Sequence, residues 1–61
     1  MNERSAFASL ARTLNRLGVR YAQWAKEAES AGKRDDYRKY LDAAAAKFSD
    51  ARWYLGAARR R

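Results

Sequence analysis

Apolar residues recur at alternating steps of three and four along both halves of the chain, which is the spacing of one apolar seam on a long α-helix. In the first half the seam consists of Phe7, Leu10, Leu14, Leu17, Tyr21, Trp24, Ala28 and Ala31. In the second half it consists of Tyr37, Leu41, Ala44, Phe48, Ala51, Leu55 and Ala58. Two such segments joined by a short connection predict an all-α antiparallel two-helix hairpin of the coiled-coil type.

Alanines in the second seam predict how the two helices meet. Ala44, Ala51 and Ala58 are seven residues apart, and a turn at residues 32–35 would place large residues opposite them. Those large residues are Trp24, Leu17 and Leu10, in the same order. A large side chain that faces a small one lets two helices pack closely in low-energy rotamers. We therefore expect facing positions whose residue numbers add up to about 68 or 69.

Glycine and aspartate residues predict where the helices begin and end. Gly32 is suited to a left-handed stop after a first helix over about residues 3–31. A second helix over about residues 36–58 would follow the turn at 32–35, with basic residues 59–61 at its end. The cap candidates are Asn2 or Ser5 for the first helix and Asp35 or Asp36 for the second.

Gly18 leaves one alternative open. A glycine inside a helix costs about 1 kcal/mol relative to alanine, so Gly18 could end a short first helix and give a three-helix arrangement. The apolar spacing continues through Gly18 without a skip, however, which favours one continuous helix.

The chain has 61 residues, which is at most one small domain. A chain of this length buries only about 60% of the surface that its unfolded form exposes. Its stability therefore depends on a further interaction, such as a disulfide, a bound metal or oligomerisation. Cysteine and histidine are both absent, which excludes disulfides and the commonest transition-metal ligands and leads us to expect no cofactor and no metal site. Self-association into a helical bundle remains as the expected source of stability.

The formal net charge of +7 is distributed unevenly. Residues 1–20 carry a net +3 and residues 51–61 a net +4, whereas residues 21–50 are balanced. A hairpin would bring the two basic segments together at its open end, where a positive field attracts nucleic acid or another anionic surface. The candidate anion-binding residues are Arg4, Arg12, Arg16, Arg20, Arg59, Arg60 and Arg61. The alternative interpretation is a solvated polar face that keeps the protein soluble.

A second group of apolar residues lies outside the predicted seam. Trp53 falls on the outer face of the second helix, with Ala46 and Ala57 on the same side and Ala43 nearby. Tryptophan is enriched where proteins contact one another, and a flat alanine surface lets another helix approach closely. We therefore expect these four residues to contact a protein partner, or a second copy in a homodimer. The alternative is that Trp53 lies partly buried against neighbouring aliphatic stems.

Two short segments resemble fragments of a DNA-binding fold. Leu17-Gly18-Val19 followed by Trp24, and later Tyr37-Arg38-Lys39-Tyr40, are similar to parts of the helix-turn-helix and wing of mercury-resistance-type regulators and phage excisionases. That resemblance implies DNA binding through the helix that follows the Gly-Val turn. It covers about a third of the chain.

The residue inventory narrows the classes of function. Without histidine, cysteine or a glycine-rich phosphate loop, we expect no enzyme and no small-molecule substrate. No signal-peptide-like or membrane-spanning apolar run occurs, so we expect a cytoplasmic protein. The mean hydropathy of −0.85 and the acidic residues on the polar faces argue against a basic helix that binds membranes. Arginine and alanine usage suits a GC-rich bacterial or phage genome. The leading prediction is a small non-catalytic interaction module that binds a protein or itself. The alternative is a regulatory protein that binds nucleic acid, as a dimeric hairpin or a degenerate helix-turn-helix.

Overall fold

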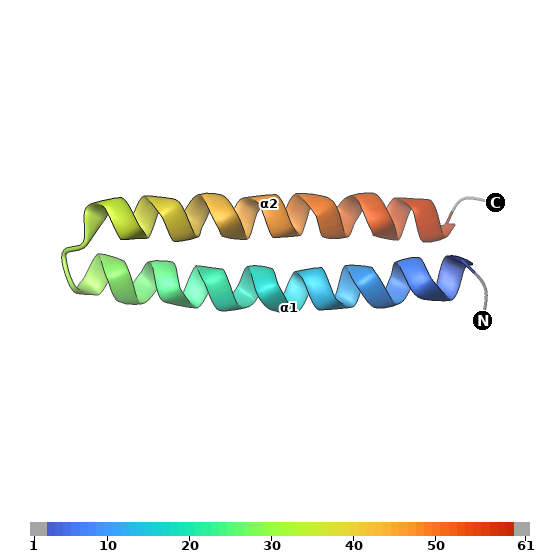
Figure 1. The fold of residues 1–61 in the computed structure, drawn as a ribbon, viewed down its shortest axis with the longest axis horizontal. Helices are drawn as coiled ribbons and strands as arrows, with labels where there is room; N and C mark the ends of the chain where they lie inside the picture. Colours follow the sequence, from blue (N-terminus) through green and yellow to red (C-terminus); the bar gives the residue numbers. More distant parts are fainter. Residues whose placement is uncertain (1–2, 60–61) are drawn as a thin grey trace.

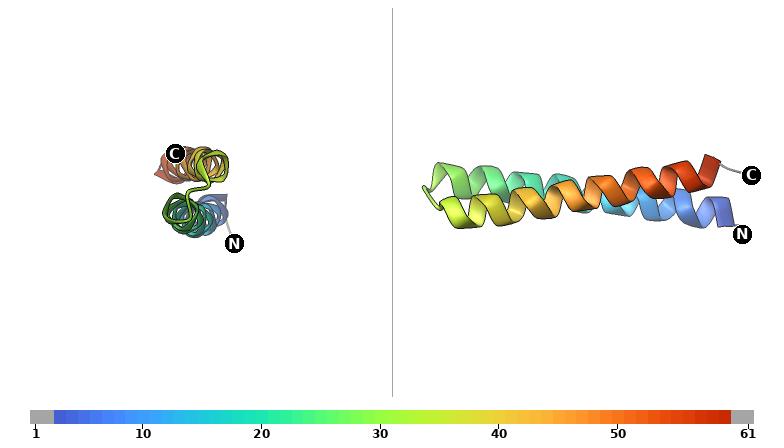
Figure 2. Two further views of the ribbon diagram at one scale, coloured as in Figure 1. Left: turned by 90° about the vertical axis from the view of Figure 1, so that its left-hand side faces the viewer. Right: turned by 90° about the horizontal axis from the view of Figure 1, so that it is seen from above.

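The protein is a two-helix antiparallel hairpin in the computed structural model, which describes residues 3–59 of the backbone. Helix α1 spans Glu3–Ser30 and helix α2 spans Arg34–Arg59. The start of α1 and the end of α2 lie at the same end of a rod that measures 46 × 14 × 10 Å (Figure 1). Viewed from above, the two helices cross at a shallow angle (Figure 2).

Helix α1 runs through Gly18 without a break, so the all-α hairpin is confirmed and the three-helix alternative is wrong. The resemblance to a helix-turn-helix is not borne out either, because the supposed Gly-Val turn lies in the middle of this helix. Helical phase, carried by apolar residues on both sides of the glycine, outweighs its low helix propensity.

Gly32 closes α1 as expected. Its φ of 74° lies in the left-handed region, and its N–H donates to the carbonyl of Glu29 at 3.1 Å. The N–H of Lys33 donates to the carbonyl of Ala28 at 2.8 Å. These two bonds form a Schellman motif, which satisfies carbonyl groups that the end of a helix would otherwise leave without a partner.

Helix α2 begins earlier than expected. The N–H of Tyr37 donates to the carbonyl of Lys33 at 2.9 Å, and the helix starts at Arg34. Asp35 and Asp36 therefore lie in its first turn and the prediction that they cap it is wrong, although their negative charge still favours the positive end of the helix. Ser5 lies inside α1 and so is not its cap, while Asn2 lies outside the described residues.

Small residues from both helices form the centre of the interface. The buried residues of α1 include Ala11, Gly18 and Ala25, which are seven residues apart, and those of α2 are Ala44 and Ala51. The two predicted seams are therefore wrong in part. Four of their large residues, three in α1 and one in α2, remain 40–44% exposed. They are Leu10, Leu17, Trp24 and Leu41.

The pairing of positions also differs from the prediction. Trp24 packs against Tyr40 with 5.8 Å between ring centroids, and Phe48 lies over Gly18. These pairs add up to 64 and 66. The reasons are the earlier start of α2, which shortens the turn, and the small residues of α1. Two helices approach most closely where both present small side chains, and the larger side chains then lie on either side of that line.

Candidate interaction surfaces

A line of large apolar residues runs along α1 beside the interface. Leu10, Leu17 and Trp24 are spaced by seven residues and are 44%, 42% and 40% exposed. Positions seven apart share nearly one side of a helix, since two turns take 7.2 residues. We call these three residues the leucine–tryptophan stripe. It forms because the neighbouring Ala11, Gly18 and Ala25 take the centre of the interface.

Aromatic packing holds the stripe at its turn end. Trp24 meets Tyr21 edge-on at 5.4 Å and Tyr40 of α2 at 5.8 Å between ring centroids. Tyr21 and Tyr40 lie 6.4 Å apart in a stacked arrangement. The guanidinium carbon of Arg20 lies 5.9 Å from the centre of the Trp24 ring, within the range of a cation–π interaction. Trp24 thus packs against three neighbouring side chains, while 40% of its surface stays exposed to solvent.

A second aromatic cluster lies near the open end of the hairpin. Phe7 of α1 packs against Tyr54 at 5.7 Å and against Trp53 at 6.4 Å, and Trp53 meets Tyr54 edge-on at 5.0 Å. Trp53 nonetheless remains 64% exposed. The contact between Trp53 and Phe7 is not apparent from the sequence, because Trp53 lies off the apolar seam of α2.

The tryptophan–alanine stripe predicted from the sequence comprises Ala43, Ala46, Trp53 and Ala57 of α2. Ala46 is exposed like Trp53, whereas Ala43 and Ala57 are half-buried. Apart from Trp53 this surface consists of small side chains. Its contact with a partner stays a prediction.

Four of the predicted anion-binding arginines have described side chains, and all four are exposed. They are Arg12, Arg16, Arg20 and Arg59. Arg4 belongs to the first turn of α1, but its side chain lies outside the described residues, as do Arg60 and Arg61. The antiparallel arrangement brings residues 3–20 and 51–59 to the same half of the rod, as expected.

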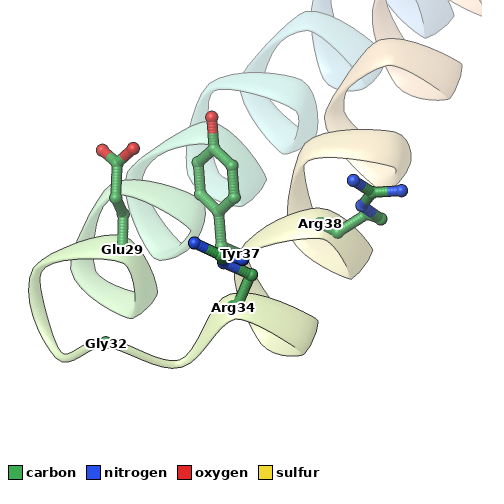
Figure 3. Close-up of a pocket in the computed structure, with 5 residues that line it drawn as sticks. All are labelled: Glu29, Gly32, Arg34, Tyr37 and Arg38. Atoms are coloured by element: carbon green, nitrogen blue, oxygen red, sulfur yellow. The ribbon is translucent and has the colours of Figure 1, made fainter.

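A shallow depression at the turn is lined by charged residues of both signs. Glu29 and Tyr37 rise next to each other above the turn, Arg34 lies at their base and Arg38 points away (Figure 3). Gly32 forms the floor. Its polar side chains point in different directions (Figure 3), whereas those of a small-molecule site converge on the ligand.

Among residues 3–59, no group of three or more acidic, histidine or cysteine side chains could hold a metal ion. Within the same residues neither helix is long and apolar enough to cross a membrane. Comparison of the chain with known protein families, with curated proteins and with solved structures finds no match.

Proposed function

We propose that this protein is a non-catalytic interaction module that docks on a protein through the leucine–tryptophan stripe. The observation that carries the proposal is the exposure of Leu10, Leu17 and Trp24 in a line along one helix. Tryptophan at the centre of an interface is among the residues that contribute most to binding, and complete burial of a leucine adds about 1.5–3 kcal/mol.

The composition of the hairpin interface supports this proposal. The buried apolar residues among those described are all alanines: Ala11, Ala25, Ala28, Ala44 and Ala51. Two helices that pack through alanine bury little apolar area, so the larger side chains stay available for contact with another molecule. A partner that covered them would stabilise the hairpin and bind it in the same step.

Photo-crosslinking from the stripe tests the proposal. A photoreactive amino acid in place of Leu10 should capture a protein, which is then purified and titrated against the unmodified chain. Binding should weaken at least tenfold in Leu17→Gln, because a polar amide would replace a buried leucine. It should be unchanged in Val19→Gln, which alters an exposed residue on another side of α1. Two outcomes would refute the proposal. One is binding that stays as tight in Leu17→Gln as in the parent chain. The other is a parent chain that binds neither the captured protein nor a second copy of itself.

A second candidate function is nucleic-acid binding at the open end. The observation that favours it is the position of the net charge of +7, all of which belongs to segments 1–20 and 51–61. Exposed arginines release counterions when they meet phosphates, so affinity should fall steeply with salt.

Fluorescence anisotropy with a labelled RNA or DNA duplex tests this second candidate. Affinity should fall by at least tenfold between about 50 and 200 mM salt for several phosphate contacts. The double variant Arg12→Gln/Arg16→Gln should bind more weakly and with a smaller salt slope. The matched control Lys26→Gln/Lys39→Gln, from the balanced half, should bind like the parent chain. Absence of binding at low salt would exclude this function.

A further inference from the structure

The face of the hairpin that carries the leucine–tryptophan stripe has matching positions on α2. Trp24 packs against Tyr40, so these two residues are level along the rod. Both helices rise by 1.5 Å per residue, which places Lys47 level with Leu17 and Tyr54 level with Leu10. Tyr40, Lys47 and Tyr54 are half-buried. The face therefore spans two heptad steps, and its six positions are apolar or aromatic except at Lys47.

The hairpin exposes more surface than a folded protein of its mass. Its accessible surface is 5117 Å², whereas a monomeric globular protein of 7.0 kDa exposes about 4,000 Å². Its radius of gyration of 14.0 Å compares with about 10.5 Å for a compact domain of this length. The excess of about 1,100 Å² exceeds the roughly 800 Å² that each partner buries in a standard interface. One additional copy of the hairpin would be enough to bury it.

We propose that a second copy of this chain covers the face, in antiparallel orientation, to form a four-helix bundle. The inference rests on the proposed function and names its partner. A two-fold symmetric interface must be self-complementary, and the spacing of the stripe satisfies this condition. When the two-fold axis passes at the level of Leu17, Leu10 of each copy lies opposite Trp24 of the other and Leu17 meets its own counterpart.

Charge determines the antiparallel orientation. A parallel pair would bring together two basic ends, each carrying the whole net charge of +7. The antiparallel pair places them at opposite ends of a rod 46 Å long. That separation is several times the Debye length of about 8 Å at physiological salt, so the repulsion between the ends is screened. The balanced segment 21–50 of each copy instead lies near the basic end of the other.

Sedimentation equilibrium over a wide range of protein concentration tests the inference. The parent chain should reach twice its mass of 7.0 kDa. Leu17→Gln should shift the dissociation constant upward by at least tenfold, whereas Val19→Gln should leave it unchanged. Circular dichroism of each variant establishes that it remains helical. Lys47→Leu should tighten the dimer, because it removes the one charge from the middle of the face.

A single cysteine introduced as Lys33→Cys reports the orientation, since the chain contains no other cysteine. Spin labels at the turns of two antiparallel copies should lie about one rod length apart, near 46 Å. Labels within about 20 Å of each other, the span expected for neighbouring helices in one bundle, would overturn the antiparallel arrangement.

Two further outcomes would overturn the inference. A monomer at every concentration would exclude the second copy, and the proposed function would still stand if a captured, purified protein bound the stripe and lost affinity in Leu17→Gln. A dimer that persisted in Leu17→Gln and dissociated in Trp53→Gln would place the interface on the tryptophan–alanine stripe instead.

Discussion

Gly18 shows how a single residue sets the distance between the helices. A Cβ atom at this position would lie 2.7 Å from Cε1 of Phe48 and 2.9 Å from two other atoms of its ring. Carbon atoms at optimal contact are about 3.5–4.0 Å apart. The aromatic ring of Phe48 therefore occupies the space that any other residue at position 18 would need.

We expect Gly18→Ala to destabilise the protein although alanine is the better helix former. Propensity would add about 1 kcal/mol, but the added methyl group forces Phe48 or the helix to move, at a cost of about 1–3 kcal/mol. Urea unfolding followed by circular dichroism measures the net change. Gly56→Ala is the matched control, because nothing lies within 4 Å of its Cβ position, and it should stabilise the protein. Equal stabilisation by both substitutions would contradict the close contact with Phe48.

At the level of the helices, the small residues of α1 and α2 together allow a short distance between the two helix axes. Ala44 and Ala51 of α2 are 3% and 1% exposed, and they lie against a helix that contributes Ala11, Gly18 and Ala25 to the same interface. In the middle of the hairpin these small residues hold the two helices close together, and the ring of Phe48 packs over Gly18. The cohesion of the pair therefore depends on a short interaxial distance rather than on large buried side chains.

We expect Ala51→Leu to separate the helices and to lower the free energy of unfolding by about 1–3 kcal/mol, the usual cost of overpacking. Ala46→Leu makes the same chemical change at an exposed position of the same helix and should alter stability by less than about 0.5 kcal/mol. Chemical denaturation of the two variants at one protein concentration gives the comparison. If both variants lost equal stability, side-chain volume at the interface would not be the determining factor.

At the scale of the whole molecule, charge and packing are distributed differently along the rod. The described parts of the two positive segments, residues 3–20 and 51–59, lie alongside each other at the open end. The balanced segment 21–50 contains the turn, its Schellman motif and the cluster around Trp24. Repulsion between the positive segments opposes closure at the open end. The turn end should consequently be the more stable half.

Salt should therefore stabilise the hairpin. Raising sodium chloride from about 50 to 500 mM shortens the Debye length and weakens repulsion at the open end, so the melting temperature measured by circular dichroism should rise. Arg16→Gln should reproduce part of the gain at low salt, by about 0.2–1 kcal/mol. Lys39→Gln, in the balanced half, should not. A melting temperature that falls with salt would show that attractive charge pairs outweigh the repulsion.

The helical character, the hairpin and the stop at Gly32 all follow from the amino-acid sequence alone. These features depend on local chemistry: the spacing of apolar residues, the conformational freedom of one glycine and the absence of proline. The sequence also determines the charge asymmetry, because an antiparallel fold necessarily brings segments 1–20 and 51–61 together.

Which side of α1 is buried depends instead on how the two helices pack against each other. Phe7, Leu14, Tyr21 and Ala28 belong equally to a seam that includes Leu10, Leu17 and Trp24 and to one that includes Ala11, Gly18 and Ala25. These two seams differ by a rotation of about 50° around the helix. Hydrophobicity favours the first seam, whereas the closest approach of two helices favours the second. Because two helices alone cannot enclose both sets, the small residues meet and the large ones remain on the surface.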